Sequence, residues 1–314
     1  MRKLEKDALL ADRDAVENIL SSIPAEDVIG QMSFRSRLGD IDKQLEELSH
    51  VDTTIGTVAL LFGGRPTHGS RAIDADFASQ ILKTYQDLIT KRIATDEVGR
   101  LGARGPVPFQ AQTTLAITEV VRGSVGFVLE EFSDNESLVA TAVKQAMDDV
   151  TEIIRSTSAN QSDEFERTIE SVGPRFFSSL KDFFITLDDK AATIRIVDDT
   201  HDEALDLSAI KRGRQRVETT EIEELEDETV VGRLLGLFPR GRKFEFELAD
   251  TGEVIHGGVA AALTPRYDAL LADRETVPIG RKWRVRMRIR RVRELNRPDR
   301  SIYTLIGLLD EVSD

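Results

Sequence analysis

The sequence contains no cysteine, one tryptophan and only four histidines among its 314 residues. Without cysteine the chain can form no disulfide, no thiolate metal site and no thiol nucleophile. None of the four histidines has a second histidine at the spacing typical of a metal site; they are His50, His68, His201 and His256. The sequence therefore predicts no metal ion and no cofactor. The lack of cysteine fits a reducing compartment, and we expect a cytoplasmic protein.

Long apolar runs and familiar catalytic motifs are also missing. No stretch reaches 18 consecutive apolar residues, so no membrane span is expected. The turn at Gly63 and Gly64 leads into Pro66 rather than into the helix start of a phosphate-binding loop. The segment from Gly123 to Gly126 lacks the flanking pattern of a nucleophile elbow. These absences favour a non-enzymatic protein.

The charge is unevenly distributed along the chain. Residues 229–314 carry 16 basic and 12 acidic side chains, whereas residues 1–228 carry 26 and 44. A basic part can meet an anionic partner, or it can be neutralised by the acidic part of the same chain. Arginine outnumbers lysine by 31 to 11, which indicates a GC-rich bacterial genome.

A pattern of apolar strand, glycine turn, second strand and amphipathic helix occurs twice, over residues 55–92 and 114–154. In the first unit the second strand is a weak one near Thr67 to Ile73, and Asp74 or Asp76 caps the helix. In the second unit Ser133 to Glu136 has the signature of a capping box. The repeat predicts an α+β domain.

Helical spacing flanks these units. Residues 1–50 read as an antiparallel pair of helices, with a break at Pro24, a short helix from Asp27 and a last helix capped by Ser33. Further on, the spacing predicts a helix over residues 162–172 that breaks at Gly173-Pro174. A phenylalanine-rich helix follows over 174–187, and it is either a core helix or a subunit interface. A strand over 192–197 and a helix over 208–217 complete this part of the chain.

After the acidic stretch at residues 218–228, the spacing of the apolar residues changes from the helical period of 3.6 to the strand period of 2. We therefore divide the chain into a helical segment, an α+β domain, an acidic linker and a small all-β barrel, with the boundaries 1–50, 51–217, 218–228 and 229–314. The barrel is expected to contain three strands, a helix over 264–272 and two more strands. This element order is that of an OB-fold. An SH3-like barrel with a helical insertion is the competing assignment.

The fourth barrel strand, residues 282–292, has the clearest alternation in the sequence. Its odd positions from Trp283 to Ile289 are apolar and its even positions are arginines, and the pair Arg290-Arg291 breaks the alternation as a bulge would. Arginines also cluster in the loops that OB-folds use on ligands. These positions form the predicted nucleic-acid-binding set: Arg240, Arg242, Lys243, Arg284, Arg286, Arg288, Arg290, Arg297 and Arg300.

Three functions remain open from the sequence. The first is a non-enzymatic bacterial protein whose α+β domain forms homo-oligomers or docks a protein partner, while the barrel contacts nucleic acid. The second is a pure protein-interaction subunit in which carboxylates of Glu245, Glu247 or the acidic linker neutralise the arginines. The third is a metal-dependent hydrolase that uses Glu119, Glu130 and Glu131.

Overall fold

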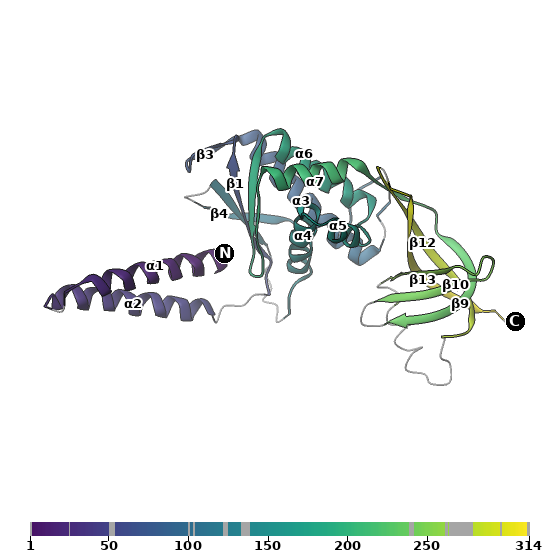
Figure 1. Cartoon of the computed structure of the whole chain (residues 1–314), viewed down its shortest axis with the longest axis horizontal. Coiled ribbons are helices and arrows are strands. Elements are labelled where there is room, and N and C mark those ends of the chain that lie inside the picture. The colour runs from purple at the N-terminus through teal and green to yellow at the C-terminus, as the bar shows by residue number, and fades with distance from the viewer. Residues whose placement is uncertain are drawn as a thin grey trace.

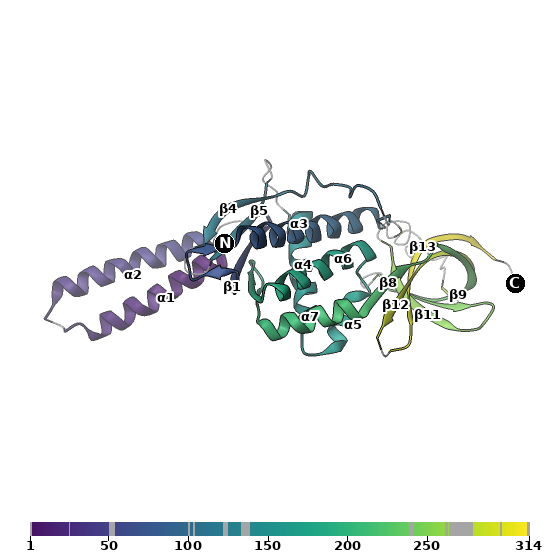
Figure 2. The same ribbon diagram turned by 90° about the horizontal axis from the view of Figure 1, so that it is seen from above.

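The structure is a computed structural model that describes residues 2–24, 26–49, 54–99, 101–102, 104–121, 125–132, 139–238, 242–260, 263, 279–295 and 297–312. A helical hairpin lies at one end, an α+β domain in the middle and a β-barrel at the other end (Figures 1 and 2). The expected class, helices and an α+β part followed by a small closed barrel, is confirmed at this level. Among the described helices, none is both long enough and apolar enough to cross a membrane.

The N-terminal hairpin consists of two helices, α1 (Arg2–Ser22) and α2 (Val28–Ser49). The predicted antiparallel pair is therefore present, but Ser33 lies inside α2 and does not cap it. Instead, Gly30 N donates to Asp27 Oδ1 at 3.0 Å, so the side chain of Asp27 satisfies an amide of the first turn. Val16 and Ile41 are the only described hairpin residues that are fully buried.

A five-stranded antiparallel sheet forms the centre of the α+β domain, in the order β4-β5-β1-β6-β7. The central strand β1 is buried on both faces, as its unbroken apolar run predicts. Val58, Leu60 and Phe62 face the helices, and the alternate residues join a smaller cluster on the other face. The bounds are β1 (Thr57–Gly64), β4 (Leu115–Val121), β5 (Val125–Glu131), β6 (Ala192–Val197) and β7 (Asp202–Leu205).

Five helices supply the large core against this sheet. The break predicted at Gly173-Pro174 is confirmed, with Gly173 at the N-cap and Pro174 at the first helical position of α6. The phenylalanines of α6 are buried within the same chain. The helices are α3 (Ala75–Val98), α4 (Ala142–Ser158), α5 (Ser162–Ile169), α6 (Pro174–Asp189) and α7 (Leu207–Thr219).

The two repeated units differ in three dimensions. Both strands of the second unit, β4 and β5, belong to the main sheet. The second strand of the first unit is instead a separate two-stranded hairpin, β2 (Thr67–His68) and β3 (Ala72–Ile73). The two units therefore share a sequence pattern but not a three-dimensional arrangement.

The helix cap of the first unit lies at a predicted residue but lacks the expected hydrogen bond, and the cap of the second unit lies elsewhere. Asp74 occupies the N-cap of α3 without a capping hydrogen bond, because its carboxylate lies 3.0 Å from His68 Nε2. Helix α4 begins at Ala142, where Thr141 Oγ1 accepts from Lys144 N at 3.1 Å. The predicted capping box at residues 133–136 lies outside the described residues, and Thr141 takes the role expected of it.

The C-terminal strands close into a five-stranded barrel. Each strand is paired on both sides, in the cyclic order β9-β10-β11-β13-β12, with β11 and β13 parallel and the other pairs antiparallel. This arrangement is consistent with a small barrel such as an OB-fold. The helix predicted at 264–272 lies outside the described residues. The strands are β9 (Glu228–Phe238), β10 (Lys243–Leu248), β11 (Val254–Val259), β12 (Lys282–Glu294) and β13 (Arg300–Glu311).

The acidic stretch contains a short strand, β8 (Thr220–Glu224), in which Ile222 stands between glutamates. Strand β8 pairs with the end of β12, which lies opposite it from Arg290 to Glu294. Opposed carboxylates and guanidiniums stabilise such a pair of strands mildly. The division of the chain at 218–228 remains a prediction, and the stretch itself is part of the sheet that extends the barrel.

Candidate functional site

The alternation along β12 places apolar side chains inside the barrel and arginines outside it. Val285, Met287 and Ile289 are buried, whereas Arg284 and Arg286 are exposed. Both ladders of β12 continue past Arg290 and Arg291 without a register shift, so the predicted bulge is wrong. The register shifts in the pairing with β13 lie earlier, near residues 284–287.

The pattern changes at Arg290 because β12 extends beyond the barrel. Val292 shares the outer face with Arg288 and Arg290, yet it is fully buried in the core of the α+β domain. Ile222 of β8 and Ile302 of β13 pack against the same core. The outer face of β12 is therefore covered at this end by the helices, and the arginines nearest to it lie at the junction of the two parts.

Arg288 and Arg290 bind groups of the α+β domain and of the acidic stretch. Arg290 donates to the carbonyl oxygens of Glu170 and Val172 between α5 and α6. Arg288 donates to the carbonyl oxygen of Gly99, and its Nε lies 3.7 Å from Glu224 and 3.6 Å from Asp227. Burial lowers the pKa of Arg290, although a guanidinium remains protonated at neutral pH.

Other arginines of the predicted set also have acidic partners. Arg284 lies 3.3 Å from Asp310, and Arg300 lies 3.3 Å from Glu294. Arg297 pairs with Glu166 and Glu294. Arg286 is exposed and has neither a hydrogen bond nor an ion pair within the described residues, and Arg240 lies outside them.

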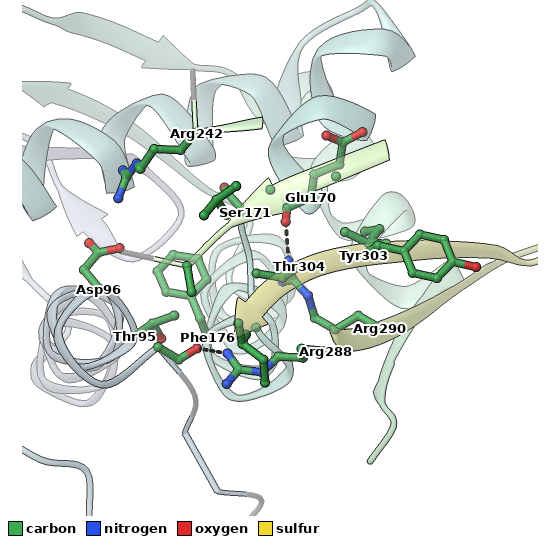
Figure 3. Close-up of a pocket in the computed structure, with 18 of the residues that line it drawn as sticks. Thr95, Asp96, Glu170, Ser171, Phe176, Arg242, Arg288, Arg290, Tyr303 and Thr304 are labelled. Atoms are coloured by element: carbon green, nitrogen blue, oxygen red, sulfur yellow. Dashed lines mark hydrogen bonds between the residues drawn. The ribbon is translucent and has the colours of Figure 1, made fainter. Parts of the chain in front are cut away.

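A cleft of about 990 Å³ opens between the barrel and the helices (Figure 3). Its barrel wall comes from β10, β11, β12 and β13, and its other wall comes from the end of α3 and from the segment that joins α5 to α6. Four members of the predicted set line it: Arg242, Lys243, Arg288 and Arg290. The other described members of that set, Arg284, Arg286, Arg297 and Arg300, lie outside it.

Two of the four, Arg242 and Lys243, keep exposed side chains at the start of β10. Arg242 faces Asp96 across the cleft (Figure 3), and Lys243 Nζ lies 3.6 Å from Glu170. Burial raises the pKa of Asp96, while the charges of Arg92 and Arg242 oppose that rise. Exposed Arg167 adds a third cation from α5. The cleft carries carboxylates as well, including Glu245 of β10.

Aromatic side chains line the same wall. Phe238 is 50% exposed at the end of β9, where it is paired with Lys243 of β10, and Tyr303 of β13 is half-buried. At Gly257 of β11 an added Cβ would lie 2.0 Å from the carbonyl oxygen of Tyr303, so only glycine allows these strands to approach so closely. The sequence does not predict this position for Phe238, because its place on a barrel strand does not reveal that the ring lies outside the core.

The carboxylates of the hydrolase hypothesis do not converge. Glu130 and Glu131 are consecutive on β5 and point to opposite faces, and Glu119 is exposed on the edge strand β4. Glu131 Oε2 accepts hydrogen bonds from Gly56 N at 3.2 Å and from Thr141 Oγ1 at 2.5 Å. Within the described residues one other group has the spacing of a metal site: Asp148, Asp198 and His201.

Comparison with protein-family models, with curated proteins and with solved structures found no significant match to this chain.

Proposed function

We propose that the protein binds single-stranded nucleic acid in the cleft between the barrel and the helices. The observation that carries the proposal is the group of Arg242, Lys243 and Phe238 on one wall of the cleft, where all three side chains are exposed. Single-stranded nucleic acid needs cations along its phosphates and an aromatic ring on which a base can stack. Tyr303 and Arg167 extend the same two kinds of contact along the cleft.

The position of these residues on the barrel supports the proposal. Arg242 and Lys243 end the loop between the first two barrel strands, and this loop is one of the two that OB-folds use on oligonucleotides. The acidic net charge of the whole chain disfavours binding of nucleic acid elsewhere on its surface, so the contact should be confined to the cleft.

A second candidate is a protein-interaction subunit whose arginines serve its own structure. The observation that favours it is the set of acidic and carbonyl partners that Arg284, Arg288 and Arg290 already have. An arginine with such partners has fewer donors left for phosphate. Arg242 and Lys243 contact phosphates if the protein binds nucleic acid, and they do not if it is an interaction subunit. This difference can be tested.

The test measures the binding of short fluorescent DNA and RNA oligonucleotides to the full chain over a series of salt concentrations. Replacing Arg242 and Lys243 together by glutamine should weaken binding at low salt. It should also flatten the dependence of log K on log salt by roughly one unit for each phosphate that is no longer neutralised. Phe238→Ala should weaken binding without changing that slope, because a stacking interaction releases no counterions.

The matched control replaces Arg35 and Arg37 of α2 by glutamine, which removes the same charge from a surface far from the cleft (Figure 1). This variant should bind like the unmodified protein. If the unmodified protein binds neither oligonucleotide at low salt, or if both double variants lose the same affinity, the nucleic-acid proposal is wrong and the interaction-subunit candidate is favoured.

A further inference from the structure

A second group of polar side chains lies inside the α+β domain, away from the cleft. It is assembled from three segments: Tyr85 of α3, Lys144, Asp148 and Thr151 of α4, and the turn from Asp198 to His201 between β6 and β7. Residues 144, 148 and 151 share one face of α4 because they are three or four positions apart. Neither the repeat nor the proposed function accounts for this group.

Asp198 is the most constrained member. Its side chain is 1% exposed, and its Oδ1 accepts from Thr200 N at 2.8 Å and from His201 N at 2.6 Å. Its Oδ2 lies 2.9 Å from His201 Nδ1 and has no other partner in the described part of the chain. Thr200 Oγ1 also donates to Asp198 Oδ1, at 3.0 Å. Asp198 is therefore a buried carboxylate that is held in place by donors of the turn that follows it.

The charges around Asp198 do not balance. Asp148 and Asp199 lie 3.5 Å and 3.4 Å from Lys144 Nζ, so one ammonium is shared by two carboxylates, and no lysine or arginine of the described residues pairs with Asp198. Asp148 is itself partly buried, with 32% of its side chain exposed. Carboxylates in a partly buried position are costly unless a cation compensates them.

Two hydroxyl groups beside these carboxylates make no hydrogen bond of good geometry to any described residue. Tyr85 is 0% exposed and Thr151 is 1% exposed, and both hydroxyl oxygens are buried and unsatisfied in the described structure. The phenol of Tyr85 lies beside the Thr151 hydroxyl and within electrostatic range of Asp198 and Asp148. A buried hydroxyl without a partner costs free energy, and a ligand or its bound water would remove that cost.

We infer that Asp148, Asp198 and His201 form a binding site for one divalent transition-metal ion. One ligand atom from each residue lies within 4.8 Å of the others. A cation about 2.1 Å from each ligand can draw them together by rotation of Asp148, whose side chain is 32% exposed. Two carboxylates and one imidazole suit Mn²⁺ or Zn²⁺ better than Mg²⁺ or Ca²⁺, which prefer oxygen ligands alone.

Three protein ligands leave coordination positions for water, as in catalytic rather than structural zinc sites. The unpartnered hydroxyls of Tyr85 and Thr151 are then available to hydrogen-bond such a water. In a metal-dependent hydrolase this site, and not Glu119, Glu130 and Glu131, would hold the metal ion. It is independent of the cleft, and its failure would leave the proposed function untouched.

The experiment uses the full chain after treatment with EDTA and removal of the chelator. Mn²⁺ is titrated and followed by the electron paramagnetic resonance signal of the free ion, and Zn²⁺ is titrated by calorimetry. We expect one saturable site per chain and a higher melting temperature with metal. Asp148→Asn and His201→Gln should each weaken binding at least tenfold, because each removes one of three ligands.

His68→Gln is the matched control, because His68 also contacts an aspartate, Asp74 at 3.0 Å, but belongs to no group with metal-site spacing in the described residues. It should bind metal like the unmodified protein. If His201→Gln fails to fold, Asp148→Asn decides, since its half-exposed side chain can be replaced without disturbing the apolar core. A chain with no saturable site, or equal affinity in Asp148→Asn and the unmodified protein, would overturn the inference.

Discussion

Arg286 and Arg290 stand on the same face of one strand, four residues apart, and have opposite environments. Arg286 is exposed, whereas Arg290 is held against carbonyl oxygens of Glu170 and Val172. The two arginine side chains are chemically identical, so their surroundings make the difference. The distance of each residue from the helices decides whether an arginine is available to a ligand or supports the junction, so each arginine of such a run has to be considered separately.

Gly213 of α7 is the residue whose replacement tests the packing of the large core most directly. A Cβ at this position would lie 2.2 Å from Cε1 of Phe184, whose ring is fully buried and cannot move aside. Gly213→Ala should therefore lower the free energy of unfolding by about 1–3 kcal/mol, as overpacking of a dense core does. Urea denaturation measures the change.

Gly39→Ala in α2 is the control, because an added Cβ there meets nothing within 4 Å. It should be neutral or stabilising by up to about 1 kcal/mol, since alanine is the better helix former. A Gly213→Ala protein as stable as the unmodified one would mean that Phe184 packs less tightly than the structure indicates.

Helix α6 shows how one helix can form the centre of the core of the α+β domain. Its phenylalanines exceed one ordinary helix face, and the sequence left open whether they formed a core or a subunit interface. In the structure they lie between the sheet and the neighbouring helices, where Phe183 and Phe184 meet edge to face at 5.7 Å. No second chain is needed to bury them, so α6 is the core helix of the domain.

Phe183→Ala should lower the free energy of unfolding by about 3–5 kcal/mol, because the ring is 0% exposed and its removal leaves a cavity. Thermal and urea unfolding of the full chain measure the change. Phe132→Ala is the matched control, since that ring is 77% exposed and its removal should change stability by no more than about 0.5 kcal/mol. A small effect of Phe183→Ala would contradict the assignment of α6 to the core.

At the scale of the molecule, the chain has two main apolar cores joined by a few residues. The barrel core contains residues of β9 to β13, and the large core contains the helices and the central sheet. Val292, Ile222 and Ile302 lie on barrel strands or on β8, yet they pack against the large core. The helical hairpin, by contrast, contributes to neither cluster and extends away from both (Figure 2).

This arrangement predicts that the barrel folds on its own and that β8 strengthens it. A fragment of residues 218–314 should melt cooperatively, and a fragment of residues 229–314 should melt at a lower temperature. The reason is that β8 pairs with β12 from Arg290 to Glu294, and the shorter fragment lacks that pairing. Circular dichroism on both fragments measures the difference. Equal melting temperatures would exclude a role for β8, and a non-cooperative melt of both would contradict an independent barrel.

Local periodicity determined much of this protein from the sequence alone. The strand at 192–197, the break at Gly173-Pro174 and the alternation of β12 depend on neighbours in the chain, and each is found in the structure. These features are local because side chains two or four positions apart share a face whatever the rest of the fold does. The element order also predicted a small closed barrel.

The tertiary structure decided which of these residues lie together. The sequence placed Arg242, Lys243, Arg288 and Arg290 in one predicted set, but only the packing of the barrel on the helices brings them into one cleft with Phe238. It likewise brings Asp148 and Asp198 together from segments fifty residues apart. Such proximity depends on which surfaces dock, and a pattern that repeats along a strand or helix carries no information about the element packed against it.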